Sequence, residues 1–260
     1  MESTMTQSRT IDDQEVEKFA AMAEEWWDPF GKFKPLHKFN PVRLAALRDR
    51  LCAHFGRDRF QKRPLEGLRL LDIGCGGGLV SEPMARLGAE VVGIDPADRN
   101  IKIAEAHRRE SGVNVDYRTV TVERLVAEKE PPFDIVLSLE AVEHVADPAY
   151  FLSQGAALVR PGGLMAVATL NRTLKSLLTA KIAAEYILRW LPAGTHDPRK
   201  FLKPAEIAGP LRQAGLTVTE EVGFSYNPLF DSWRESDDLE VNYLVVAHRP
   251  EAADPPASRS

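Results

Sequence analysis

The stretch LLDIGCGGG, residues 70–78, decides the fold of this chain. It begins as a short apolar run that predicts a strand, and its glycines lead into a helical segment over 79–87. A second apolar run, EVVGID at 90–95, predicts the next strand. A strand, a helix and a strand at this spacing indicate a right-handed βαβ unit of a parallel sheet. Ligands bind such sheets at the carboxyl ends of strands, and glycine lets a ligand approach the backbone, so the loop at 74–78 is the expected binding site.

The same alternation of strands and helices continues toward the carboxyl terminus. Two late strands, 216–222 and 241–248, connect directly and predict an antiparallel pair at the sheet edge. The fold class is therefore α/β, a Rossmann-like and mostly parallel seven-stranded sheet with helices on both faces. The other expected strands lie at 114–120, 133–139 and 164–170, and the expected helices at 100–110, 148–159 and from Pro204 to Gly215.

Before the sheet, the sequence predicts two helices separated by an irregular aromatic segment. Asp12 and Asp13 open the first helix, which carries Val16 and Phe19 on one face, and the second helix begins at about Pro41. We expect the aromatic segment at 26–39 either to close over the ligand or simply to pack on the core.

The composition of the chain excludes several classes of function. The chain has 260 residues, of which 44% are hydrophobic, and a formal net charge of −5 that argues against a nucleic-acid partner. Only two cysteines are present, which excludes a disulfide scaffold and a cysteine-based zinc site. No signal peptide and no apolar run of membrane-spanning length are visible, so we expect a cytoplasmic protein.

We expect one large domain over residues 11–250. Residues 11–66 form an N-terminal helical cap in this division, and residues 171–203 form an amphipathic insertion. The two ends, 1–10 and 251–260, are polar or rich in proline, alanine and serine and are expected to be disordered.

The nucleotide that the glycine loop would bind can be narrowed further. Asp95 closes the second strand, where an acid accepts hydrogen bonds from ribose hydroxyls. A dinucleotide fingerprint requires glycine at its sixth position, which is Leu79 here, and this weakens the alternative of an NAD-dependent oxidoreductase. The acidic Asp72 before the loop suits the ammonium of S-adenosylmethionine better than a pyrophosphate. The chain thus resembles the class I S-adenosylmethionine-dependent methyltransferases.

A second cluster, EAVEHVADP at 140–148, follows the fourth strand. On a helical turn Glu140, Glu143 and His144 would share one face, beside the cofactor pocket. Two carboxylates and an imidazole could hold a divalent cation that polarises a phenol oxygen. The spacing leaves two alternatives open: His144 acts as a general base without metal, or His144 and Glu140 are structural.

Four separate stretches of the sequence resemble one family of methyltransferases more closely. Together they resemble the ubiquinone biosynthesis O-methyltransferases over nearly the whole chain, and the first and last strings are the most specific. The resemblance implies methylation of a ring hydroxyl on a polyprenylated catechol or hydroquinone, at two steps of the pathway. The strings are WWDPFGKFKPLHKFNPVRL at 26–44, LLDIGCGGG at 70–78, EAVEHVADP at 140–148, and ATLNRTLKS at 168–176 followed by AEYILRWLPAGTHD at 184–197.

The resemblance also implies the roles of individual residues. Arg43 would reach the methionine carboxylate, and Gly74, Asp95 and Leu139 would complete the cofactor site. Many relatives have methionine at the position of Leu139, and the stretch PADRNI at 96–101 also departs from common relatives, so no adenine contact is named. The metal-binding pattern of parts of the family matches Glu140, Glu143 and His144, with Mg²⁺ or another divalent cation as the ligand.

The insertion at 171–203 is the segment that we expect to contact a membrane. Lys181, Glu185 and Arg189 form one polar stripe of a helix whose other faces hold Tyr186 and Trp190. Such a helix suits a membrane interface, and a polyprenyl substrate resides in the bilayer, so we expect peripheral contact with the inner face of the membrane through 174–191. A lid helix that packs on its own core is the alternative.

We therefore expect an S-adenosylmethionine-dependent O-methyltransferase with a polyprenyl-phenol substrate. Other ubiquinone-biosynthesis proteins are expected as possible partners, and nucleic acid is not. The alternatives are another small-molecule methyltransferase, a tRNA or protein methyltransferase, the oxidoreductase, and a non-catalytic scaffold.

Overall fold

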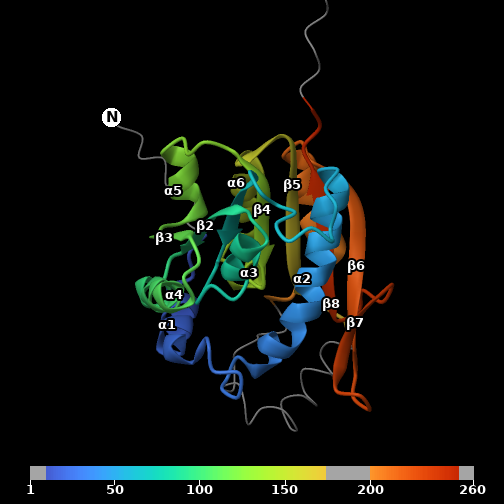
Figure 1. Ribbon diagram of the computed structural model, residues 1–260. Coiled ribbons are helices and arrows are strands. Elements are labelled where there is room, and N and C mark those ends of the chain that lie inside the picture. Colours follow the sequence, from blue (N-terminus) through green and yellow to red (C-terminus); the bar gives the residue numbers. More distant parts are fainter. Residues whose placement is uncertain (1–9, 174–199, 252–260) are drawn as a thin grey trace, which may run out of the picture.

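The computed structural model describes residues 10–173 and 200–251 (Figure 1). Eight strands of this part of the chain form one sheet in the order β3-β2-β1-β4-β5-β8-β6-β7. The first five strands pair in parallel, and β8, β6 and β7 extend the sheet by antiparallel pairing. The strands are β1 Arg69–Ile73, β2 Glu90–Asp95, β3 Val115–Thr119, β4 Phe133–Leu139, β5 Val159–Leu170, β6 Thr217–Asn227, β7 Ser232–Ser236 and β8 Asn242–His248.

This architecture confirms the predicted fold class and corrects the strand count. The expected direct connection between the last two strands is wrong, because β6 runs on to Asn227 and returns through β7. Tyr226 pairs across the hairpin with Trp233, whose ring lies 4.7 Å from the ring of Phe39 in the helix below. This tertiary contact stabilises β7, whose five residues carry no strand pattern clear enough to predict it.

The helices cover both faces of the sheet. Buried side chains of α2, α3 and α4 pack on one face, and those of α5, α6 and α8 pack on the other. No helix in the described ranges is long and apolar enough to cross a membrane. The helices are α1 Asp13–Ala21, α2 Lys34–His54, α3 Ser81–Arg86, α4 Asp98–Ser111, α5 Val122–Ala127, α6 Pro148–Ala157 and α8 Pro204–Gln213, with 3-10 turns η1 Ala23–Glu25 and η2 Val142–His144.

Helix α2 begins seven residues earlier than the sequence predicts, at Lys34 and not at Pro41. Pro35 lies in its first turn, where a missing N–H costs nothing, and Pro41 is accommodated inside the helix. The expectation of an irregular segment up to residue 40 is therefore wrong. The stabilisation gained by burying Phe39 against the sheet exceeds the cost of the helix hydrogen bond that Pro41 cannot donate.

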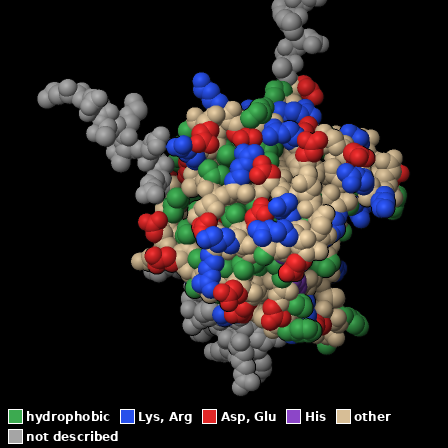
Figure 2. Space-filling model, turned by 60° about the vertical axis from the view of Figure 1, so that its left-hand side comes forward, with side chains coloured by type: hydrophobic (Ala, Val, Ile, Leu, Met, Phe, Trp, Pro, Cys, Tyr) green, Lys and Arg blue, Asp and Glu red, His purple; other side chains and the backbone are tan. Residues whose placement is uncertain are grey.

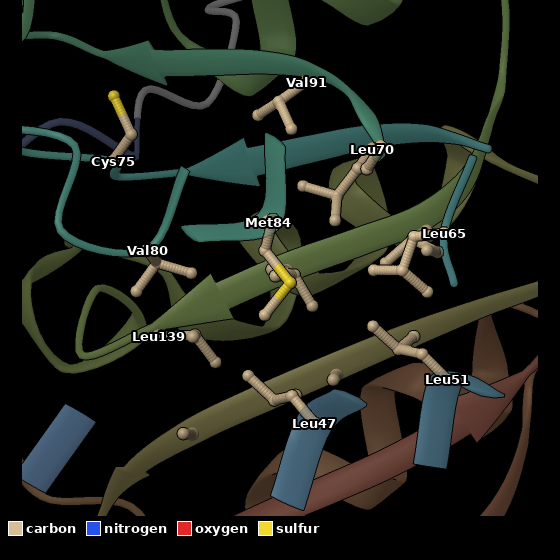
Figure 3. Close-up of a cluster of buried hydrophobic side chains, with 14 of the residues drawn as sticks. Leu47, Leu51, Leu65, Leu70, Cys75, Val80, Met84, Val91 and Leu139 are labelled. Atoms are coloured by element: carbon tan, nitrogen blue, oxygen red, sulfur yellow. The ribbon is translucent and has the colours of Figure 1, made fainter. Parts of the chain in front are cut away.

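The larger core joins α2 to the sheet. Figure 3 shows Leu47 and Leu51 of α2 facing Leu70 of β1 and Met84 of α3. All four side chains are essentially inaccessible to solvent. Burying a side chain of this size contributes about 1.5–3 kcal/mol, so this face fixes α2, and the residues at its start, relative to the glycine loop.

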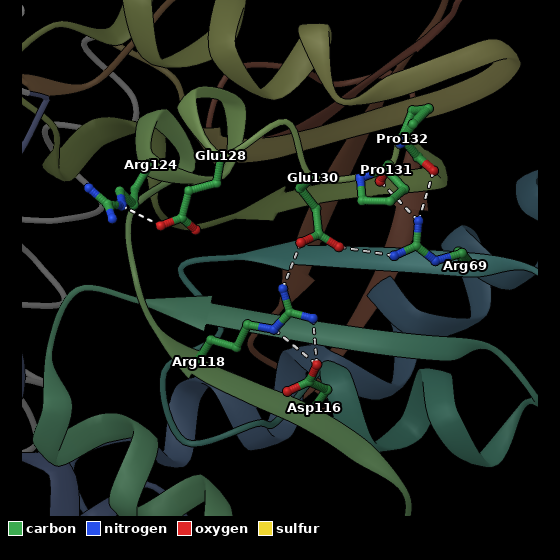
Figure 4. Close-up of polar contacts among 8 residues, drawn as sticks. All are labelled: Arg69, Asp116, Arg118, Arg124, Glu128, Glu130, Pro131 and Pro132. Carbon is green, nitrogen blue, oxygen red and sulfur yellow. Dashed lines mark hydrogen bonds and ion pairs between the residues drawn. The ribbon is translucent and has the colours of Figure 1, made fainter.

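Polar contacts tie the strands together away from the core. Glu130 accepts from Arg69 of β1 and from Arg118 of β3, and Arg118 also pairs with Asp116 (Figure 4). Arg69 further donates to the carbonyls of Pro131 and Pro132, just before β4. The half-buried Glu130 carboxylate therefore joins β1 to β3, and Arg69 links them to the loop before β4.

Candidate functional site

A cleft opens at the carboxyl ends of β1, β2 and β4, the edge that the sequence predicts. Gly74 and Asp95 line it together with Glu140 and His144, so these four predicted residues meet at one site. The cleft encloses about 780 Å³ including space open to solvent, within the 300–1,000 Å³ that small-molecule pockets occupy. Arg43 and Leu139 are not among the lining residues, because Arg43 is buried behind Glu140 and the Leu139 side chain packs in the core.

The glycine loop after β1 requires its glycines. Gly74, Gly76 and Gly78 have positive φ angles of 75°, 53° and 91°, which residues with a Cβ rarely adopt. A Cβ at Gly74 would lie 2.7 Å from Ala141, and one at Gly76 would lie 2.5 Å from the indole of Trp26. The loop is thus shaped both by backbone conformation and by close neighbours on two sides.

Asp95 is held at the end of β2 by three donors. Its Oδ1 accepts from the backbone N–H of Ala97 at 2.8 Å and from Asn100 Nδ2 at 3.2 Å, and its Oδ2 accepts from Gly76 N–H at 3.1 Å. Burial raises the pKa of Asp95 despite these bonds. Since each carboxylate oxygen has two lone pairs, Oδ2 can accept one more hydrogen bond, as a ribose hydroxyl would offer.

The N-terminal segment forms the outer wall of the cleft. Trp26 Nε1 donates to Asn100 Oδ1 at 3.0 Å, and Trp27 Nε1 donates to the carbonyl of Gly77 at 2.8 Å. Phe19 of α1 lines the cleft beside them. The first residues of the aromatic segment thus close over the glycine loop, whereas those from Phe33 onward pack inside the protein.

Glu140 has a strained backbone conformation and a perturbed carboxyl group. Its φ of 55° is unusual for a residue with a Cβ, and Arg43 Nη1 donates to its Oε1 at 3.1 Å. Burial and the neighbouring Glu143 carboxylate raise the pKa of Glu140 to about 7, against the opposing effect of Arg43. The buried Asp72 accepts from Ser81 Oγ at 2.6 Å, and burial raises its pKa to about 6. Three acids and one arginine therefore share this desolvated region.

The prediction that Glu140, Glu143 and His144 share one face of a helical turn is wrong. Residues 142–144 form a 3-10 turn, and Glu140 precedes it in the left-handed conformation. Glu143 Oε2 accepts from Thr169 Oγ1 at 2.8 Å, while its buried Oε1 has no hydrogen-bond partner among the described residues and lies 3.9 Å from His144 Nε2. The three side chains lie close together but point to different neighbours.

His144 has a partner that sequence reasoning missed. Its Nδ1 lies 3.0 Å from Oε2 of Glu15, which comes from α1, 129 residues earlier. Lys200 Nζ contacts the other oxygen of Glu15 at 3.1 Å, and the hydrogen bond to His144 is the main cause that lowers the pKa of Glu15 to about 2. The amphipathic pattern of α1 indicates which of its faces turns toward the protein, but no local pattern identifies which polar group Glu15 meets.

A metal ion does not fit the present arrangement of these groups. Within the described residues no three His, Cys, Asp or Glu side chains are placed to hold a metal ion together. Glu140 faces the guanidinium of Arg43, a cation that competes for the same carboxylate, and His144 faces Glu15. In the part of the chain that the structure describes, Glu143 Oε1 is the one carboxylate oxygen of the trio that is buried without a hydrogen-bond partner.

Comparison with known proteins decides the family. A family model described as a methyltransferase domain matches residues 41–221. A ubiquinone biosynthesis O-methyltransferase from Sinorhizobium fredii is 59% identical over 94% of this chain and 98% of its own length. One of the same name from Rhizobium etli is 59% identical over 93% of this chain and 97% of its own. This chain belongs to the ubiquinone biosynthesis O-methyltransferases. Membership confirms the resemblance found in the sequence, and with it the prediction of an S-adenosylmethionine-dependent O-methyltransferase.

Solved structures support the fold of this O-methyltransferase. Magnesium protoporphyrin IX methyltransferase from Synechocystis, solved with bound SAH, aligns with a TM-score of 0.65 and 19% identity over 92% of this chain and all of its own. A possible histamine N-methyltransferase from Thermotoga maritima aligns with a TM-score of 0.56 and 18% identity over 90% of this chain and 99% of its own. At this identity the likeness concerns the fold alone.

Proposed function

We propose that this protein transfers the methyl group of S-adenosylmethionine to a ring hydroxyl of a polyprenylated catechol or hydroquinone. Both the 2-polyprenyl-6-hydroxyphenol and the 3-demethylubiquinol are substrates of this class. The observation that carries the proposal is the cleft that the glycine loop and Asp95 share with Glu140 and His144. A donor bound by the first pair presents its methyl group to an acceptor held by the second.

The cofactor would extend along the carboxyl ends of β1 and β2. Asp95 Oδ2 accepts from the ribose, and Gly74 gives the aminoacyl end room to approach the backbone. Ala97 and Val120 add apolar surface on the far side, where a purine fits. Arg43 bonds Glu140 and Asn40 behind the cleft wall, and its Nε has no partner among the described residues, so a shift of the guanidinium would bring it to the methionine carboxylate. Leu139 would contribute its backbone.

His144 is the proposed base of the transfer. A phenol titrates near about 10, so almost none is ionised at neutral pH. His144 Nε2 accepts the phenol proton while the ring oxygen attacks the methyl carbon and the sulfur leaves with its electron pair, giving the methyl ether and S-adenosylhomocysteine. Glu15 at Nδ1 fixes the ring orientation, and the Glu143 carboxylate 3.9 Å from Nε2 stabilises the imidazolium that forms.

The residue roles are tested by turnover of a polyprenyl catechol with and without EDTA. We expect His144→Ala to lower kcat by about a hundredfold while the affinity for S-adenosylhomocysteine is unchanged, since a general base contributes about 10²–10⁴. The rate of the unmodified enzyme should not respond to EDTA. Loss of turnover on chelation, restored by Mg²⁺, would instead assign Glu140, Glu143 and His144 to a divalent cation.

The membrane and partner predictions extend the same proposal. The segment 174–191 lies outside the described residues, so contact with the inner face of the membrane, from the cytoplasmic side, rests on its sequence and on the lipid substrate. Charge reversal at Lys181 and Arg189 together should weaken binding to anionic liposomes, and unchanged co-sedimentation would remove this role. Copurification with other ubiquinone-biosynthesis proteins tests the proposed partners.

A further inference from the structure

One face of α4 supports the N-terminal wall of the cleft. Asn100, Ile103 and His107 follow one another at intervals of three and four residues, so they lie on the same face of this helix. Asn100 is buried, and Ile103 packs on the apolar cluster that contains Trp26. The opposite face carries charged side chains such as Lys102, which is 74% exposed. Figure 2 brings the side of the molecule with α1 and α4 to the front, and basic and acidic side chains are scattered over it.

His107 is held on two sides, by Glu82 and by Trp27. Its Nδ1 lies 2.7 Å from Oε1 of Glu82, a fully buried carboxylate of α3 whose Oε2 accepts from Arg86 at 2.9 Å. A carboxylate oxygen only accepts, so Nδ1 carries the hydrogen of this bond. The imidazole lies flat on the indole of Trp27, with ring centroids 3.4 Å apart and 4° between the ring planes. One edge and one face of the His107 ring are therefore fixed, and they fix the position of Trp27.

Trp27 in turn holds one peptide group of the glycine loop. Its Nε1 donates to the carbonyl of Gly77 at 2.8 Å, and the N–H of the same peptide group, on Gly78, donates to the carbonyl of Cys75 at 2.9 Å. A peptide group between two glycines rotates easily, because neither residue has a Cβ that restricts φ and ψ. The two hydrogen bonds supply this restriction and hold the loop in one conformation.

A second route from α4 to the glycine loop runs through Asn100. Its Oδ1 accepts from Trp26 and its Nδ2 donates to Asp95, which also accepts from the N–H of Gly76. A change at Asn100 would consequently disturb the acid that faces the ribose. The route through His107 uses only side chains outside the lining of the cleft, so it can be altered without touching a cofactor contact.

We propose that His107, backed by Glu82, is a positioning residue for the cofactor, which acts by holding Trp27 on the carbonyl of Gly77. This inference rests on the proposed function for the identity of the cofactor as S-adenosylmethionine. A loop that is already ordered loses less conformational freedom when this sulfonium nucleoside binds, so it binds the nucleoside more tightly. The step that depends on His107 is therefore binding of the donor and not transfer of the methyl group.

The test compares His107→Asn with Lys102→Asn in calorimetric titrations with S-adenosylhomocysteine. Asparagine at 107 keeps a donor for Glu82 but offers no ring to Trp27, and Lys102 is a matched control because it is exposed on the same helix and pairs with Asp98. We expect His107→Asn to weaken binding about tenfold, as one lost hydrogen bond at the loop would, while the control binds as the unmodified protein does. Equal affinity of both variants and the unmodified protein would overturn the proposal.

Turnover and an aromatic replacement separate positioning from a general loss of structure. His107→Asn should raise the KM for S-adenosylmethionine about tenfold and leave kcat at saturating donor within about twofold of the unmodified enzyme. His107→Phe keeps a flat ring for Trp27, so its affinity for S-adenosylhomocysteine should return to within about threefold of the original. An affinity as low as that of His107→Asn, or a fall in kcat with unchanged KM, would refute the role of the ring.

Trp27→Phe completes the test, because it removes the donor to Gly77 and keeps an aromatic ring. In that background His107→Asn should weaken binding by less than about a further twofold, since both changes break the same contact. Losses that multiply would show that His107 acts by another route and would overturn the proposal. If the unmodified protein itself binds no S-adenosylhomocysteine, the proposed function fails together with this inference, whereas normal binding by every variant removes this inference alone.

Discussion

At the scale of single residues, Asp95 is oriented by partners that lie near it in the sequence, whereas His144 is oriented by one from a distant part of the chain. Asp95 is oriented by Asn100 and Gly76, and His144 by Glu15. The sequence predicts Asp95 and Gly74 because a strand and its loop are local patterns. It cannot predict Glu15, because that contact exists only once α1 packs beside the cleft.

Asp95→Asn tests the cofactor role at this scale. An amide has only one oxygen, so an NH₂ group faces either Gly76 N–H and the ribose hydroxyl or Ala97 N–H and Asn100 Nδ2, and those donors lose their acceptor. We expect the affinity for S-adenosylhomocysteine, measured by calorimetry, to fall about 10- to 100-fold. Asp98→Asn is the control, since Asp98 is exposed on α4 and pairs only with nearby groups. Equal affinity of the two variants would contradict the assignment.

Asp72 makes a pH-dependent contribution to stability. Burial raises its pKa from 3.8 to about 6, so between these values the folded protein keeps a proton that the unfolded chain has lost. Stability therefore falls as pH rises through this window and is flat above it. Asp72→Asn should match the unmodified protein near pH 4 and exceed it by about 2–3 kcal/mol at pH 7. Urea unfolding at several pH values measures the difference, and a constant difference would refute it.

At the scale of elements, the glycine loop and the wall over it act as one unit. An added Cβ at Gly76 would meet the ring of Trp26, which also stacks on Phe33 with ring centroids 3.8 Å apart. Gly76→Ala should therefore displace the wall, lower the free energy of unfolding by about 1–3 kcal/mol and weaken cofactor binding.

Gly209→Ala is the matched control for this change. Gly209 lies in α8 with open space around its Cα, so alanine there should stabilise the protein by about 0.5–1 kcal/mol through helix propensity. Chemical unfolding and calorimetry of both variants provide the measurement. Similar stability of the two variants would show that Trp26 does not need the glycine.

The elements that sequence reasoning predicted are those with strong local patterns. The parallel strands and α6, which begins at Pro148 as expected, follow from apolar runs and turn residues. The start of α2 and the whole of β7 were not predicted, because tertiary packing of Phe39 and Trp233 overrides weak or misleading local signals. The direction in which the Glu140 side chain points was not predicted either, since its left-handed backbone conformation has no signature in the sequence.

At the scale of the whole molecule, the cleft and its N-terminal wall occupy one edge of the sheet. Residues that are far apart in sequence, from Phe19 through Asp95 to His144, meet there because parallel strands deliver their carboxyl ends to the same side. Ligand binding at this edge should consequently stabilise the entire fold, since the ligand would contact residues from α1, β1, β2 and β4 at once.

Thermal unfolding with candidate cofactors tests this coupling and separates the function classes. At a concentration of about a hundred times its Kd, a ligand that binds only the folded state adds about 2.7 kcal/mol. For a chain of this size that corresponds to a rise in Tm of about 5–10 °C. S-adenosylhomocysteine should produce this rise and NAD should not, because Leu79 occupies the position at which a dinucleotide loop needs glycine. Asp95→Asn should show no comparable rise at the same concentration. A rise with NAD alone would reject the methyltransferase site and favour an oxidoreductase, and no rise with either ligand would favour a scaffold without a cofactor.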